Sequence, residues 1–175
     1  MDTERFNRWV RASRVADKIQ PFMIVALQGL GRLDSQLVEQ GGSWLEQTNN
    51  STAAIAKSVL LNETFTLSYL WVLGAYELIR TICQRCHVYR KTLGESLCDR
   101  LYSLKGDFER LRIPLAKMEP ARKYKQTDYP IAYPALHRDL GISWKISENV
   151  FISRRELSDS LLSLLEDISA KVKVD

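Results

Sequence analysis

The stretch Thr64–Arg90, TFTLSYLWVLGAYELIRTICQRCHVYR, decides the fold. From Phe65 to Ile79 its apolar residues fall on every side of a helical wheel, which is typical of a helix inside a bundle or a bilayer. This apolar part is shorter than the roughly 20 residues that a membrane span needs, and it contains Ser68 and Glu77. We therefore predict a buried central helix over 64–90, about 40 Å long, in a soluble helical domain.

Amphipathic segments lie on both sides of this helix. Residues 3–20 predict a helix with Arg8, Arg11 and Arg14 on its polar face. That face is either a phosphate-binding stripe or a solvated surface. A second helix is expected from Pro21 until Gly41-Gly42 ends it.

Three features of the first half bear on helix packing. Gly29 and Gly31 within the second helix indicate a kink or a close helix crossing. Ser43 is expected to cap a short turn, followed by a loop over 47–52. Helix restarts at Thr52, and the sequence leaves open whether it continues into the central helix.

The second half predicts a helix from about Leu97 that ends at Pro114, and then a basic irregular segment over 112–134. Alternating apolar residues over 142–152 predict a small β-hairpin or extended flap, within an insertion over 140–153. Ser153 and Glu156 form a capping box for a last helix over 154–173.

Together these segments predict an all-α protein: a single-domain bundle of about five to six helices spanning residues 1–175. Its 45% hydrophobic and 26% charged residues are ordinary for a globular domain. The net charge of +4 favours anionic partners weakly. An odd count of three cysteines and a polar N-terminus, MDTERFNRW, predict a cytoplasmic protein with free thiols.

The strongest charge feature is a cluster near the end of the predicted Leu97 helix. Between residues 112 and 125 five basic residues and one acidic residue carry a net charge of +4, equal to that of the whole chain. Tyrosine and proline residues also occur in this segment. The stripe of Arg8, Arg11 and Arg14 is a candidate extension of the same basic surface. This composition suits phosphate binding, and its alternative is a solvated loop. The candidate nucleic-acid-binding residues are Arg112, Lys117, Arg122, Lys123, Tyr124 and Lys125.

The sequence Cys83-Gln84-Arg85-Cys86-His87 matches the haem-attachment pattern C-x-x-C-H. Its position within a continuing helix, with no export signal, argues against haem. No second Cys/His pair follows at zinc-finger spacing, so we expect no metal and no cofactor.

The second half also resembles the HEPN superfamily. The resemblance rests on Arg112-Ile113-Pro114-Leu115-Ala116-Lys117. The family motif has an arginine, a gap of four to six residues and a histidine; this stretch keeps the arginine and a four-residue gap, with Lys117 at the histidine position. The resemblance implies a small all-α bundle, often dimeric, from bacterial defence, toxin–antitoxin or RNA-cutting systems. A second match places Arg80 and His87 with six residues between them.

Lys117 departs from the family pattern. The family's histidine is thought to serve in cleavage driven by the RNA 2′-hydroxyl, which needs a group that titrates near neutrality. A lysine instead supplies a fixed positive charge for a phosphate. The resemblance thus implies a helical bundle that binds nucleic acid, whereas the lysine argues against ribonuclease activity.

Three functions follow as hypotheses. The first is a catalytically degenerate HEPN-like protein that binds RNA or another polyanion. The second is a protein-interaction module, with a cognate partner or a homodimer and no membrane, whose aromatic anchors are Trp44, Trp144, Tyr129 and Tyr133. The third is an active, metal-independent endoribonuclease that uses Arg80 and His87, or Arg112 with a distant histidine.

Overall fold

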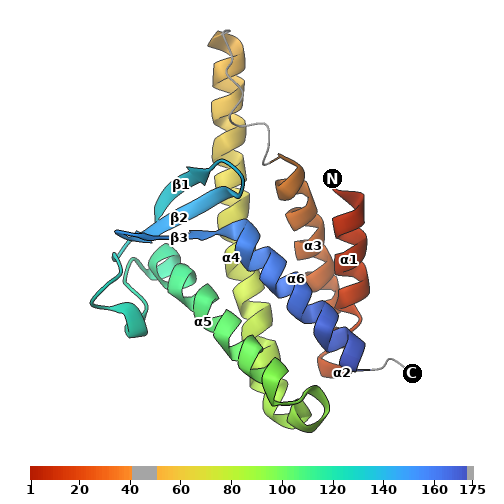
Figure 1. Ribbon diagram of the computed structural model, residues 1–175. Coiled ribbons are helices and arrows are strands. Elements are labelled where there is room, and N and C mark those ends of the chain that lie inside the picture. The colour runs from red at the N-terminus through yellow and green to blue at the C-terminus, as the bar shows by residue number, and fades with distance from the viewer. Residues whose placement is uncertain (41–50, 173–175) are drawn as a thin grey trace.

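A computed structural model describes residues 1–40 and 51–172, with side chains for all of these except residues 51–54, 87, 91 and 92. The chain is mostly helical, as predicted, and carries a small sheet (Figure 1). The elements are α1 (Thr3–Ser13), α2 (Ala16–Ile19), α3 (Met23–Gln40), α4 (Ser51–Leu93), α5 (Glu95–Lys117), the 3-10 turn η2 (Arg122–Tyr124), β1 (Tyr133–His137), β2 (Gly141–Ser147), β3 (Val150–Ser153) and α6 (Arg154–Lys171). The predicted turn at Ser43 and the loop over 47–52 fall outside the described residues, apart from Ser51 and Thr52, which belong to α4.

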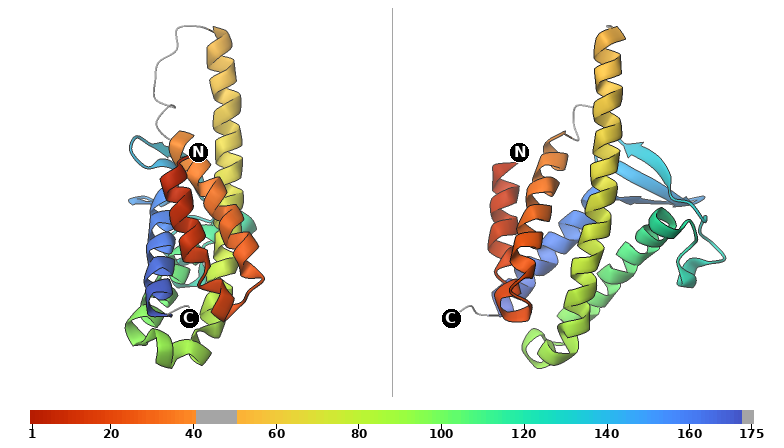
Figure 2. Two further views of the ribbon diagram at one scale, coloured as in Figure 1. Left: turned by 90° about the vertical axis from the view of Figure 1, so that its right-hand side faces the viewer. Right: turned by 180° about the vertical axis from the view of Figure 1, so that it is seen from behind.

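Helix α4 is one helix of 43 residues, so the segment that restarts near Thr52 does continue into the central helix. It packs against α3, α5 and α6, and α5 folds back along it after Gly94, whose positive φ of 82° suits a glycine (Figures 1 and 2). The prediction of a helix buried on every side is wrong in part. Trp71, Val72 and Ile79 are buried, but Leu70 is 50% exposed because no described element covers that face.

The end of α4 nearest residue 51 extends beyond the other helices (Figures 1 and 2). Ile55 and Val59 are 68% and 63% exposed there. Their spacing of four residues places both side chains on one face of the helix. Within the described ranges no helix, α4 included, combines the length and the apolar character that a membrane crossing requires.

The predicted hairpin is part of a three-stranded antiparallel sheet, ordered β1-β2-β3. Strand β2 turns at Glu148-Asn149 into β3, as expected, and its Trp144 pairs with Pro134 of β1 and Ile152 of β3. Strand β1 is not predicted by the sequence pattern: its first two residues belong to the irregular segment expected over 112–134, and residues 135–137 lie between that segment and the insertion expected over 140–153. Pro134 is tolerated since β1 is an edge strand, which can do without one N–H donor.

Two helix boundaries differ from the prediction. The expected helix over 3–20 breaks at Arg14 and Val15, whose N–H groups bond to carbonyls three residues back, and this tighter turn lets Val15 and Ile19 reach the core. Pro114 does not end α5, which continues to Lys117. The buried Pro114 ring and the neighbouring core contacts compensate for the hydrogen bond that proline removes.

A buried polar cluster joins three helices. The Asp34 carboxylate on α3 accepts hydrogen bonds from Arg5 Nε (2.5 Å), Trp9 Nε1 (2.8 Å), Ser158 Oγ (2.6 Å) and an Arg154 nitrogen. Burial opposes ionisation of Asp34, but Arg154 and Arg5 outweigh it and hold the pKa of this carboxyl below its ordinary value. The cluster therefore fixes α1 and the start of α6 against α3.

The predicted close crossing occurs at one of the two glycines. Gly31 of α3 lies so close to Trp9 of α1 that an added Cβ atom would overlap the indole side chain. Gly29 has open space around it. Ser153 caps α6 as predicted, with its hydroxyl accepting from the N–H groups of Arg155 (3.0 Å) and Glu156 (3.5 Å).

Candidate nucleic-acid interface

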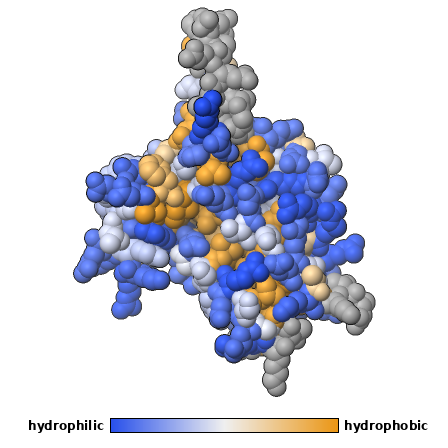
Figure 3. All heavy atoms as spheres, viewed as in Figure 1, coloured by the Kyte–Doolittle hydropathy of each residue, from blue (hydrophilic) through white to orange (hydrophobic). Residues whose placement is uncertain are grey.

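The six predicted binding residues lie on two segments that face one another. Arg112 and Lys117 belong to the last turns of α5, and the others belong to η2 and the residue after it. Between the two segments Met118 adopts a left-handed conformation (φ 56°), which ends α5 and reverses the chain. The segment after α5 forms a hydrophilic projection at the lower left of Figure 3.

Arg110 and Asp128 hold this segment in place. The Arg110 guanidinium donates two hydrogen bonds to the buried Asp128 carboxylate, at 2.8 and 2.9 Å. It also stacks over the Tyr124 ring, 4.0 Å from the centroid. The backbone N–H of Tyr129 donates to Ile146 O at 2.7 Å, which fastens the segment to β2. These contacts hold the basic segment against α5 and β2, while its cations Arg122, Lys123 and Lys125 remain exposed to solvent.

A groove of about 740 Å³ lies between α5 and η2. One wall is α5 and the other is the turn that carries Arg122, Lys123 and Tyr124. Tyr102, on the α5 wall, is half exposed and offers an aromatic face. The other lining residues are Ser103, Gly106, Asp107, Glu109, Ile113 and Ala121.

The predicted cations differ in how far they are neutralised. Arg112 lies 5.0 Å from the Tyr76 ring centroid and 3.9 Å from Glu77, and Lys117 lies 3.7 Å from Glu119. Arg122, Lys123 and Lys125 are exposed and form no ion pair with any described residue. These three residues are the cations most available to a phosphate.

Two carboxylates line the same groove. Glu109 accepts hydrogen bonds from Lys105 Nζ (2.6 Å) and Tyr76 Oη (2.9 Å). Burial alone would raise the pKa of Glu109, but these donors lower it, so the carboxylate stays ionised. Burial raises the pKa of Asp107 more strongly than Arg110 and Lys123 lower it. The groove therefore combines cationic and acidic lining residues.

Arg80 lines a second recess of about 480 Å³, which shares Tyr102 and Glu109 with the groove. Its Nε donates to Glu77 at 2.7 Å. His87 follows about two helical turns further along α4, roughly 10 Å away along the axis, and its side chain is outside the described set. The other histidine, His137, ends β1, and its Nδ1 accepts from the N–H groups of Asp139 and Leu140. Neither recess contains it.

The cysteines correct a prediction. Cys86 and Cys98 form a disulfide between α4 and α5, because the helical hairpin brings the two positions together, and Cys83 alone is a free thiol. Since Cys86 is engaged, the C-x-x-C-H pattern does not present two free thiols. Throughout the described ranges no three His, Cys, Asp or Glu side chains gather in a way that could hold a metal ion.

The four aromatic residues predicted as interface anchors differ in their exposure. Trp144 is wrong as an interface anchor, because it is 2% exposed and packs in the core. Tyr129 and Tyr133 lie edge to face at 5.7 Å, with Tyr133 about half exposed, and Trp44 falls outside the described residues.

The arginine stripe on α1 is not beside the basic segment. Helix α1 lies on the opposite side of the molecule from η2 (Figures 1 and 2). Arg8 is paired with Glu166 by two hydrogen bonds of 2.8 Å, whereas Arg11 and Arg14 are exposed. The stripe is therefore no extension of the groove.

Sequence reasoning missed Tyr102, Asp107 and Glu109 as groove residues. They lie on the solvent side of α5, where spacing alone gives no sign of a facing segment. Comparison of the chain with protein-family models, with curated proteins and with solved structures finds no match.

Proposed function

We propose that this protein binds single-stranded RNA in the groove between α5 and η2 without cleaving it. The observation that carries the proposal is that Arg122 and Lys123, two exposed cations without an ion pair to any described residue, line one groove with the exposed ring of Tyr102. The resemblance of residues 112–117 to the HEPN motif adds a class: a catalytically degenerate member of a bacterial defence or toxin–antitoxin system.

Each part of the groove suits one part of a nucleotide. Arg122 and Lys123 would neutralise phosphates, which makes binding dependent on salt. Tyr102 would stack on an unpaired base, an interaction typically worth about 1–3 kcal/mol. Glu109 and Asp107 would accept hydrogen bonds from exocyclic amino groups of bases, as carboxylates do with cytosine. A uniformly basic surface would have no such carboxylate acceptors and could contact only the phosphates.

The test measures binding of a fluorescently labelled 12-nucleotide RNA by anisotropy over a series of salt concentrations. We expect Arg122→Ala/Lys123→Ala to weaken binding and to lower the slope of log K against log salt by about 0.7 for each phosphate that is no longer neutralised. Tyr102→Ala should weaken binding without changing the slope, because stacking releases no counterions.

The matched control is Arg11→Ala/Arg14→Ala, which removes the same charge from the opposite side of the molecule. This variant should bind RNA as the wild type does. Equal weakening by both double variants, or an affinity independent of salt, would show that the groove is not the binding site.

The exposed face of α4 favours a second candidate function, self-association through this helix. Ile55 and Val59 are exposed on one face, with Leu60 beside them. A second copy that packs along this face would bury them. Light scattering after size exclusion should give a dimer for the wild type and a monomer for Val59→Lys. Gln36→Lys, which adds the same charge at an exposed position of α3, should leave the dimer intact. A monomeric wild type removes this candidate.

A further inference from the structure

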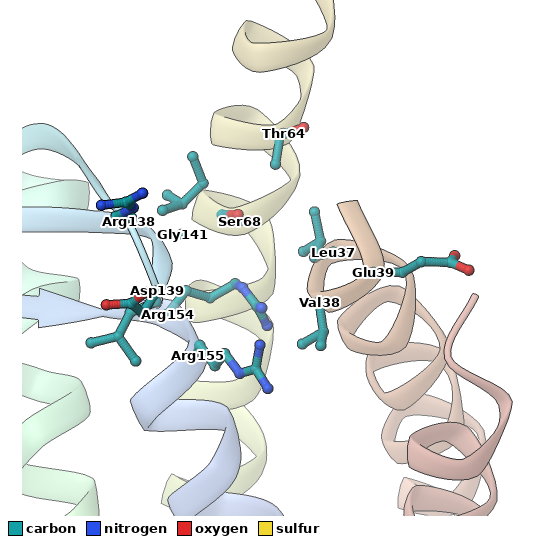
Figure 4. A pocket seen from close by; sticks show the side chains of 12 residues that line it. Leu37, Val38, Glu39, Thr64, Ser68, Arg138, Asp139, Gly141, Arg154 and Arg155 are labelled. Atoms are coloured by element: carbon teal, nitrogen blue, oxygen red, sulfur yellow. The ribbon is translucent and has the colours of Figure 1, made fainter. Parts of the chain in front are cut away.

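Another cavity, of about 430 Å³, lies on a different part of the molecule. It forms where the end of α3, the middle of α4, the β1–β2 turn and the start of α6 meet (Figure 4). Leu37 and Val38 line it on the α3 side. Arg154 and Arg155 extend toward them from the start of α6, and Arg138 lines it from the β1–β2 turn.

Ser68 lies on the α4 wall of this cavity (Figure 4). It is fully buried, and among the described residues its hydroxyl is the only buried side-chain oxygen or nitrogen without a hydrogen-bond partner. The nearby Thr64 and Thr66 instead donate to carbonyls one turn back, at 2.8 and 3.0 Å. A buried hydroxyl without a partner destabilises a fold, so the Ser68 hydroxyl is available to bond a ligand atom in this cavity.

Arg154 has unused hydrogen-bonding capacity as well. Its side chain is 4% exposed and donates one hydrogen bond within the described ranges, to Asp34, while its guanidinium lies 5.5 Å from the Trp71 ring. Asp34 is shared with Arg5, which also pairs with Asp159 at 2.6 Å, whereas Asp34 is the one carboxylate among the described residues that forms an ion pair with Arg154. Burial, together with the charge of Arg5, lowers the pKa of Arg154 despite the interaction with Asp34. An additional anion would compensate that buried charge.

The other two arginines are more open. Arg138 forms no ion pair with any described residue, and Arg155 has only a long contact of 3.8 Å with Asp159. Two carboxylates also line the cavity. Glu39 is bound by the N-terminal amine and points away from it, and Asp139 points away from the Arg154 and Arg155 guanidinium groups (Figure 4).

We propose that this cavity binds a small, partly apolar molecule through a phosphate or carboxylate group. The oxyanion is held by Arg154, Arg155 and the Ser68 hydroxyl, with Arg138 at the edge, and the apolar part lies against Leu37 and Val38. The positive end of the α6 dipole contributes to the attraction, although the Ser153 cap already occupies the N–H groups of Arg155 and Glu156. The site is independent of the RNA-binding groove.

The experiment uses phenyl phosphate and benzoate as probes, with isothermal titration calorimetry and thermal shift, against sodium chloride at equal ionic strength. At least one probe should bind and raise the melting temperature beyond the chloride control. Binding of phenyl phosphate alone assigns a phosphate ligand, and binding of benzoate alone assigns a carboxylate. If neither probe exceeds the chloride control, the proposal is wrong.

Variants identify the site. Arg155→Gln should weaken probe binding roughly tenfold or more, since it removes one charge-assisted hydrogen bond. Arg32→Gln, an exposed arginine of α3 outside the cavity, should bind as the wild type does. Equal affinities of the two variants would place the probe elsewhere and overturn the assignment.

Ser68→Ala separates a binding role from a packing defect. We expect the free protein to melt at the same or a higher temperature, because an unsatisfied hydroxyl is removed, while affinity for the probe falls. Unchanged affinity would show that Ser68 takes no part in binding.

Discussion

Asp34 and Arg154, separated by 120 positions in the sequence, form a buried ion pair that joins α3 to the first residue of α6. The pair has a consequence for both halves of the molecule. It fixes where α6 begins, and so the position of Arg155 and of the cavity beside it. It also shares its carboxylate with Arg5, so that α1 depends on the same residue.

Asp34→Ala should destabilise the protein strongly. The substitution leaves the buried guanidinium groups of Arg5 and Arg154 without their shared carboxylate, and breaking a buried pair in this way costs about 3–5 kcal/mol. Chemical denaturation followed by circular dichroism measures the change in stability. Asp17→Ala, an exposed aspartate of α2, should change stability by less than about 0.5 kcal/mol. Similar effects of the two variants would contradict a structural role for the cluster.

The same carboxylate predicts a pH dependence. Arg154 and Arg5 hold the pKa of Asp34 in the folded chain below the ordinary value of 3.8. The contribution of Asp34 to stability is therefore complete above about pH 4 and is lost as the pH falls through the folded-state pKa. Between about pH 2 and 7, the stability of the wild type should depend more steeply on acid than that of Asp34→Asn, as measured by denaturation curves. Parallel profiles would show that Asp34 does not contribute to acid unfolding.

The buried cluster has a signal in the sequence, namely charged residues at apolar positions of three helices. Arg5 lies on the buried stripe of α1 with Trp9 and Ala12, and Asp34 and Arg154 likewise occupy apolar stripes of their helices. A charged residue on such a stripe indicates a buried partner. Which charges pair depends on the arrangement of helices distant in sequence, and local spacing does not contain that information.

The helices could be predicted because apolar periodicity is a local property of each segment. Strand β1 and the continuation of α5 through Pro114 could not, since tertiary contacts there override a local proline signal. The same contrast applies to the groove between α5 and η2. Its cations are close together in the sequence, so their clustering could be predicted. Tyr102 and Glu109 come to lie opposite them because the chain reverses at Met118, which the sequence pattern does not reveal.

The two glycines of α3 offer a matched pair of substitutions. Gly31→Ala should be destabilising, because the new methyl group overlaps Trp9 and forces α1 away from α3. Gly29→Ala meets no atom within 4 Å and should stabilise the helix by about 0.5–1 kcal/mol. Melting temperatures of the two variants should move in opposite directions. A stable Gly31→Ala protein would mean that α1 does not cross α3 at this point.

The Cys86–Cys98 disulfide closes a short loop at the α4–α5 turn, with a sequence separation of 12 residues. Reduction should lower stability by about 2–4 kcal/mol, the usual range for a disulfide. The melting temperature with and without a reducing agent measures this effect, and Cys98→Ser should be insensitive to the agent. Burial raises the pKa of Cys83 to about 11, so this thiol should react slowly with a thiol reagent until the protein unfolds. Two or more rapidly reacting thiols in the native protein would contradict the disulfide.

The final prediction concerns catalysis. If residues 112–117 correspond to the HEPN motif, as proposed, Lys117 takes the position of its histidine, and Arg80 is engaged with Glu77. We therefore expect a bound single-stranded RNA to stay intact across about pH 5–9, measured by gel electrophoresis at protein concentrations that saturate binding. Since the chain has two histidines, a positive result can be traced. If the RNA is cut and His87→Ala abolishes cutting while His137→Ala does not, the Arg80–His87 pair is the active site and the non-catalytic proposal is wrong.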